Sequence, residues 1–163
     1  MTFGRAGGPT RAHTLSLRGR ALRLLSQREH SRAELSAKLR THCETQEELD
    51  ALLNDLAAND WLDDKRAADS LVHRQSNKFG SARIRQDLQS KGVSSDLISE
   101  ALAGLHVSEA ARAQVVWQKK FGSLAQSPAD RAKQMRFLMT RGFSAGIASQ
   151  IINGRISRDA DSD

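Results

Sequence analysis

The sequence predicts an all-α protein of three tandem three-helix units, helix-turn-helix-like in order and stacked into an elongated, curved array. Three observations predict this. Good helix formers such as Ala, Leu, Arg, Gln and Glu dominate the 163 residues, and runs of Val, Ile and Thr are missing. Apolar residues follow the i, i+3, i+4 spacing of helices between the two polar ends of the chain. The apolar pattern also repeats about every 49–50 residues.

The repeat can be followed position by position. The apolar residues Leu35, Leu39, Leu49, Leu53 and Leu56 return 49 residues later as Ile84, Leu88, Ile98, Leu102 and Leu105. The segment from Leu88 to Gly92 returns 50 residues later as Leu138 to Gly142. Because one such unit buries little apolar surface alone, we expect neighbouring units to stack.

The repeat sets the expected organisation of the chain. We expect a disordered basic arm at 1–15, repeats at 16–62, 63–106 and 107–154, and a flexible tail at 155–163. Within the repeats, helices are expected at 16–29, 31–41, 45–59, 63–79, 81–91, 94–104, 107–121, 127–141 and 144–153.

Residues that favour helix ends stand at most of these boundaries. Side-chain caps satisfy free amides at a helix start, and glycine adopts the left-handed turn that ends a helix. Expected caps are the capping boxes Ser31/Glu34 and Thr45/Glu48, the Asp63–Asp64 pair, and Ser127 before Pro128, with helix stops at Gly92 and Gly142.

Charge is distributed unevenly along the chain. The net charge is +6, and residues 108–154 carry seven Lys and Arg against two Asp and Glu. Such an excess favours anionic partners. It predicts an anion-binding surface for DNA phosphate or an acidic protein, although charge runs are often only a solvated face. The candidate residues are Arg83, Arg85, Lys91, Lys119, Lys120, Arg131, Lys133, Arg136 and Arg141.

The helix–Gly–apolar–Ser–helix turn also resembles a DNA-reading helix-turn-helix. In that motif the helix after the turn enters the major groove. Here that helix carries Glu47, Glu48, Asp96 and Glu100, whose carboxylates would repel phosphates. We therefore interpret the turns as packing turns between helices.

The sequence offers no recognisable catalytic or metal site. The five His are scattered over the units, and Cys43 is the lone cysteine, so neither a zinc site nor a disulfide is expected. No stretch has the length and hydropathy of a membrane span or a signal peptide. We expect a cytoplasmic, monomeric protein that is not an enzyme, has no cofactor and does not contact membrane.

Taken together, the motifs resemble the RecX family of recombination regulators over about residues 17–154. They are Arg28-Glu29-His30-Ser31-Arg32, then Trp61-Leu62-Asp63-Asp64, then Lys78-Phe79-Gly80 with the segment to Val93. The resemblance implies three tandem three-helix units. It also implies a regulator of DNA repair and the SOS response that binds the RecA–DNA filament and inhibits ATP hydrolysis, strand exchange and coprotease activity.

Two positions depart from the family pattern. Ala67 stands where the family often has an aromatic residue, and Cys43 stands where the sibling units have Gly92 and Gly142, which predicts a longer first turn. The alternative function is a sequence-tolerant DNA-binding helical repeat protein, which would bind naked DNA as well as a filament. A helical enzyme would need a cleft of carboxylates or His that the spacing does not offer.

Overall fold

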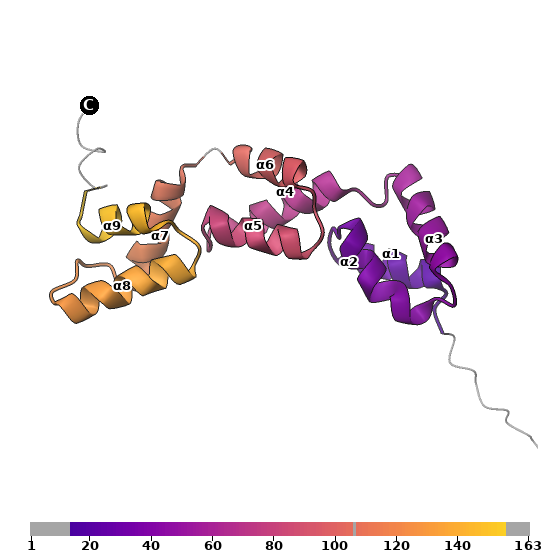
Figure 1. Cartoon of the computed structure of the whole chain (residues 1–163), viewed down its shortest axis with the longest axis horizontal. Helices are drawn as coiled ribbons and strands as arrows, with labels where there is room; N and C mark the ends of the chain where they lie inside the picture. The colour runs from indigo at the N-terminus through magenta and orange to yellow at the C-terminus, as the bar shows by residue number, and fades with distance from the viewer. Residues whose placement is uncertain (1–13, 106, 156–163) are drawn as a thin grey trace, which may run out of the picture.

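A computed structural model describes residues 14–105 and 107–155, and within these ranges every regular element is a helix (Figure 1). The expected basic arm and flexible tail lie almost wholly outside the described residues. The nine α-helices stand in three successive groups of three, which form an elongated, arched row. The predicted fold class is therefore confirmed. The helices are α1 (Leu17–Gln27), α2 (Arg32–Leu39), α3 (Gln46–Ala58), α4 (Asp64–Gln75), α5 (Ser81–Ser90), α6 (Ser95–Ala103), α7 (Glu109–Lys120), α8 (Pro128–Thr140) and α9 (Ala145–Ile152).

The predicted N-terminal caps are confirmed, but the reciprocal halves of both capping boxes are not formed. Ser31 accepts a hydrogen bond from the amide of Glu34 at 3.1 Å, whereas the Glu34 carboxylate turns away to bind Arg28. The Glu48 carboxylate accepts from the amide of Glu44 at 3.0 Å rather than from Thr45. An arginine and a neighbouring amide thus compete successfully for these carboxylates. Asp63 and Ser127 cap α4 and α8 as expected.

The turn between the second and third helices of a unit is not the same in all three units. The first unit, which has Cys43 in place of glycine, makes the predicted longer turn through a 3-10 helix, η1 (Arg40–His42). The other two turns place Gly92 and Gly142 at φ of +72° and +91°, as predicted. Helix α4 ends at Gln75 rather than near 79, because the chain must leave the helix to bring Gly80 to the next unit.

Each unit has its own small apolar core. The buried clusters are built on Leu35, Leu39 and Leu49 in the first unit, on Ile84, Leu88 and Ile98 in the second, and on Leu138, Ala148 and Ile151 in the third. Removing each such leucine or isoleucine from water contributes about 1.5–3 kcal/mol. The repeated apolar positions therefore stabilise single units, and other contacts must join the units.

One hydrogen bond joins the first unit to the second, and another at the matching positions joins the second unit to the third. The side chain of Ser31 donates to the carbonyl of Lys91, and the amide of Gly80 donates to the carbonyl of Arg141 at 2.8 Å. Ser31 and Gly80 are the N-caps of α2 and α5, and Lys91 and Arg141 are the matching residues of the following turns. The middle helices of the first two units, α2 and α5, therefore place their starts against the turn of the following unit.

A second repeated contact accompanies the first. The amide of Arg32, the first residue of α2, donates to Asp64 Oδ1 at 2.7 Å, and the amide of Ser81, the first residue of α5, donates to Glu109 Oε1 at 3.0 Å. Asp64 and Glu109 are the first residues of α4 and α7. In the third unit the first helical residue of the middle helix is Pro128, which has no amide hydrogen, so this contact could not continue beyond the third unit.

Glycine makes the second joint possible. A Cβ added to Gly80 would lie under 3.0 Å from the backbone of Gly142 and Phe143, and one added to Gly142 would lie under 3.0 Å from Arg83. Arg112 of α7 completes this joint by donating to the carbonyls of Ser76 and Phe79 at 3.0 and 2.8 Å. The second and third units are thus held by close backbone approach and a buried arginine.

Candidate anion-binding surface

Cations and aromatic rings alternate across the joint between the second and third units. The guanidinium of Arg83 lies over the ring of Phe79, 4.1 Å from its centre, and Arg141 lies 5.5 Å from the same ring. Arg141 also lies 5.1 Å from the ring centre of Phe137, and Lys120 Nζ lies 6.0 Å from it. We call these five residues, Arg83, Phe79, Arg141, Phe137 and Lys120, the cation–aromatic cluster.

The helices explain why these side chains meet. Lys133, Phe137 and Arg141 follow one another at i, i+4 spacing, so they share one face of α8 and its C-terminal turn. Phe79 and Arg83 have the same spacing at the start of α5. The joint then places the end of α8 against the start of α5, and the two stripes become one surface.

The positive charge of this cluster is not neutralised within the described part of the chain. None of the ion pairs among the described residues includes Arg83, Lys120 or Arg141. Among the described residues, the Arg83 side chain donates a hydrogen bond only to the neutral carbonyl of Thr140, at 3.3 Å. Aromatic rings interleaved with unpaired cations are a common surface for nucleic-acid backbones and bases. Here both rings are half-buried against the unit cores and hold the cations in place, so the cluster presents mainly positive charge to an anion.

The other candidate cations fall into two groups. Arg85, Lys119, Lys133 and Arg136 are exposed, and their side chains make no hydrogen bond or ion pair with any residue that the structure describes. Lys91 instead bonds Asp87 Oδ1 at 2.7 Å, and Arg131 donates to the side-chain oxygen of Asn153. The first group is available to a partner, whereas the side chains of Lys91 and Arg131 are held by residues of their own units.

Two carboxylates near the first joint, those of Asp87 and Glu34, have lowered pKa values because cations of the protein bind them. Burial would raise the pKa of Asp87, but hydrogen bonds from Lys91 and Gln75 hold it below its usual value. Burial likewise opposes ionisation of Glu34, whose pKa is nevertheless lowered by Arg28. Both carboxylates therefore stay charged and bound to cations of the protein itself.

The structure shows no metal-binding cluster beside these surfaces in residues 14–105 and 107–155. No group of three or more His, Cys, Asp or Glu side chains is close enough to hold a metal ion there. His30 is buried and its Nδ1 lies 2.9 Å from the carbonyl of Arg28, and burial lowers its pKa. None of the described helices could cross a membrane.

The sequence did not reveal the aromatic part of the cluster or the role of Arg112. In the sequence, Phe79 stands in the Lys78-Phe79-Gly80 motif, and neither that motif nor the position of Phe137 predicts a place on a cationic surface. The i, i+4 spacing of Lys133, Phe137 and Arg141 was the available signal, but it could not show that Phe79 lies beside Arg141.

Comparisons with known proteins agree over the whole helical region. Family models for the first, second and third three-helix domains of RecX match residues 18–56, 63–102 and 108–152. The regulatory protein RecX of Ralstonia nicotianae is 47% identical over 86% of this chain and 88% of its own length. That of Leptothrix cholodnii is 46% identical over 85% and 88%.

Solved structures show the same architecture. A crystal structure of RecX from Lactobacillus salivarius superposes with a TM-score of 0.70 at 24% identity, covering 86% of this chain and 95% of that one. A second crystal structure, of a regulatory protein RecX, gives a TM-score of 0.69 at 26% identity, covering 84% and 71%.

Proposed function

This chain belongs to the RecX family of regulatory proteins, and from that membership we propose that it binds the RecA–DNA filament and inhibits the recombinase without catalysing a reaction. The inhibited activities would be ATP hydrolysis, strand exchange and coprotease function. We propose that it acts in the cytoplasm as a monomer and meets DNA mainly within the filament.

The observation that carries the proposal is the cation–aromatic cluster at the joint of units two and three. A recombinase filament contains a polyanion, which attracts unpaired cations over a distance of about 10 Å at moderate salt. The exposed cations Lys133 and Arg136 on α8 extend the same charge along the third unit. Binding would therefore concentrate in the C-terminal half of the array.

The elongated shape supports the same proposal. Three rigid units in a row can contact several subunits of a repeating filament at once (Figure 1). Several weak contacts on one rigid body raise the overall affinity by a large factor, because the second contact is made at high effective concentration. This explains how a surface without a deep catalytic cleft could still inhibit.

The proposal is tested with recombinase assembled on single-stranded DNA, whose ATP hydrolysis is followed as the protein is added. The test variant changes Lys120, Lys133 and Arg136 to Ala, because these three side chains are exposed and bind no carboxylate of the described chain. Each lost phosphate contact flattens the salt dependence of binding by about 0.7, so loss of three flattens it by about 2. The variant should remain helical and inhibit weakly.

A matched control changes Arg20, Arg23 and Arg40 to Ala in the first unit, where the side chains likewise lack ion pairs in the described structure. This control should inhibit almost like the parent. If both triple variants inhibit equally, the basic surface is only solvated and the proposal is wrong about it. Equal binding to naked DNA and to filament would instead favour the sequence-tolerant DNA-binding alternative.

A further inference from the structure

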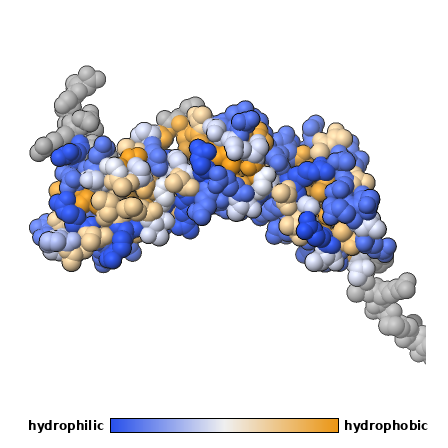
Figure 2. Space-filling model, in the orientation of Figure 1, coloured by the Kyte–Doolittle hydropathy of each residue, from blue (hydrophilic) through white to orange (hydrophobic). Residues whose placement is uncertain are grey.

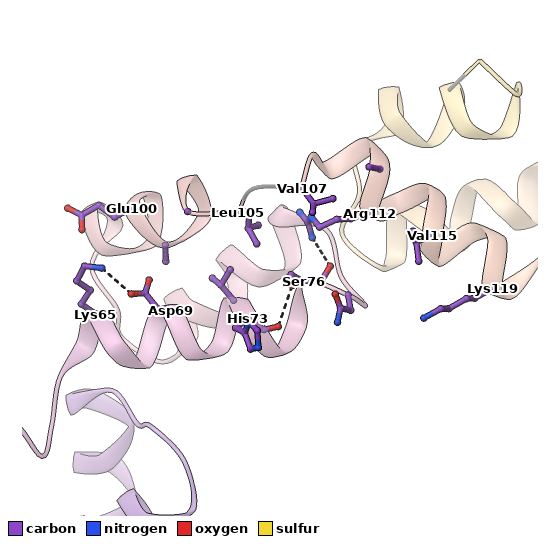
Figure 3. Close-up of a pocket in the computed structure, with 15 residues that line it drawn as sticks. Lys65, Asp69, His73, Ser76, Glu100, Leu105, Val107, Arg112, Val115 and Lys119 are labelled. Atoms are coloured by element: carbon purple, nitrogen blue, oxygen red, sulfur yellow. Dashed lines mark hydrogen bonds and ion pairs between the residues drawn. The ribbon is translucent and has the colours of Figure 1, made fainter. Parts of the chain in front are cut away.

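A second surface of different character lies between α4, α6 and α7. It is an open groove of about 960 Å³ that runs across the joint between the second and third units (Figure 3). Its apolar residues are Val72, Ala101, Leu105, Val107, Ala111 and Val115. Val107 and Val115 are 56% and 51% exposed, which makes them two of the most exposed large apolar side chains in the described chain.

Two helices line this groove with side chains at helical spacing. Lys65, Asp69 and His73 follow one another at i, i+4 along α4, and Ala111, Val115 and Lys119 do so along α7. Figure 3 shows Lys65, Asp69 and His73 in line along one face of α4, with Val115 and Lys119 on α7, which lies beyond the C-terminal end of α4. Figure 2 shows apolar surface gathered over α6, which contributes a third wall. The result is an open groove lined by α4, α6 and α7, with an apolar floor.

The two ends of the groove differ in charge. At the end formed by the start of α4, Lys65 is bound to Asp69 at 3.0 Å and Glu100 lies nearby, so one negative charge is left over. At the α7 end, Lys119 is exposed and forms no ion pair with any described residue. Arg112 lies along the same side of the groove.

Arg112 is an unusual residue in such a wall. It is only 7% exposed, its partners are two carbonyls and one serine hydroxyl, and its Nε has no hydrogen-bond partner among the described residues. Burial lowers its pKa. The terminal nitrogens of Arg112 are already bound and its Nε is enclosed by the protein, so no ligand in the groove can hydrogen-bond to that Nε. The carboxylate of Glu109 lies close enough to raise the pKa of Arg112 and balances part of its charge. Arg112 therefore acts on the groove only through its charge, which adds to that of the exposed Lys119.

We propose that this groove binds an amphipathic helical segment of the recombinase subunit, with its apolar side chains on Val107 and Val115 and a carboxylate at the end beside Arg112 and Lys119. The inference rests on the proposed function, because it takes the filament protein as the partner. Its apolar residues would recur at i, i+3 or i+4 and i+7, as in other helix-in-groove complexes. The opposite end would favour a cation or a helix N-terminus beside Glu100.

The groove suits protein better than DNA. DNA-binding surfaces are strongly basic, whereas the floor here is apolar and the α4 end carries a net negative charge. An all-helical body offers no sheet edge to an extended peptide in its described part, so a helix is the segment that can fill a trough between helices. The cation–aromatic cluster, made of other residues, remains available to phosphate.

The direct test is photo-crosslinking from inside the groove. Cys43→Ser removes the single cysteine, Val115→Cys supplies a new one, and a benzophenone maleimide is attached there. Irradiation on a recombinase–single-stranded DNA filament should crosslink the recombinase protein within an amphipathic helix that carries a carboxylate. The same label at Leu124→Cys, which is 48% exposed but outside the groove, should crosslink far less. Crosslinks to DNA alone, or equal yield at both positions, would overturn the inference.

A pair of charge variants separates this inference from the proposed function. Val107→Glu with Val115→Glu should weaken filament binding at least about tenfold while leaving helical content and binding to bare DNA unchanged. Leu15→Glu with Leu124→Glu, two other half-exposed sites, should bind filament like the parent. If the parent inhibits and the groove variant inhibits equally, the groove inference is wrong and the proposed function stands. If the parent itself neither binds nor inhibits the filament, both are wrong.

Discussion

The same substitution, glycine to alanine, should have opposite effects at two positions only four residues apart. Gly142 lies in the turn that meets the second unit, has φ of +91°, and would bring a Cβ under 3.0 Å from Arg83. Gly146 lies inside α9, and a Cβ there meets nothing within 4 Å. The pair therefore tests whether the joint between the units exists as described.

The expected magnitudes follow from these two environments. An alanine forced into the left-handed region costs about 1–2 kcal/mol, and overpacking against a neighbouring backbone costs a further 1–3 kcal/mol or so. Gly142→Ala should thus lower the free energy of unfolding by about 2–5 kcal/mol. Gly146→Ala should raise it by about 0.5–1 kcal/mol, because alanine loses less backbone entropy in a helix.

Urea unfolding monitored by the fluorescence of Trp117 is the suitable assay. Trp117 is buried in the third unit and donates to Gln134 Oε1 at 2.9 Å, so its emission reports that unit. Trp61, exposed near the first joint, is removed by Trp61→Phe in every variant. Small-angle scattering of Gly142→Ala should also show a looser, more variable row.

Gly80→Ala provides an independent check of the reasoning. Its φ is −76°, so alanine meets no backbone penalty there, but its Cβ would collide with the backbone of Gly142. We expect destabilisation of about 1–3 kcal/mol from overpacking alone. If Gly142→Ala and Gly80→Ala are both as stable as the parent, the units do not approach as closely as we describe.

Three further outcomes are expected. Arg112→Met should lower the free energy of unfolding by about 2–3 kcal/mol, because it leaves the carbonyls of Ser76 and Phe79 without their charged donor. Urea titration measures this change, and an unchanged midpoint would contradict it. Burial lowers the pKa of His30 below 6.5, so as the pH falls the imidazole of the unfolded chain binds a proton before that of the folded chain. The free energy of unfolding should therefore fall as the pH drops below about 6.5. The loss of thermal stability between pH 7 and pH 5 should be smaller in His30→Gln than in the parent. The acidic helices α3 and α6 should give no base-specific footprint on DNA, and protection that is lost on changing residues 46–50 or 95–100 would refute this.

Much of the local structure could be predicted because its causes are local. Helix periodicity, the caps at Asp63 and Ser127, and the left-handed glycines depend on residues a few positions apart. The repeat then extended these local rules to three units. In each predicted capping box only the Ser or Thr hydrogen bond forms. The carboxylate of Glu34 binds Arg28 instead, and that of Glu48 binds the amide of Glu44.

The fold class, the three-unit repeat and the uneven charge are therefore properties of the sequence itself, because helical period, turn glycines and net charge depend on neighbouring residues. The joints, the cation–aromatic cluster and the groove are decided by tertiary structure. Phe79 and Arg141 are distant in sequence and meet only when the turn after α8 packs on the start of α5. Arg112, an ordinary helix residue in the sequence, is buried for the same reason. The physical cause is the close approach at Gly80 and Gly142, which sets the relative orientation of two units that are otherwise independent.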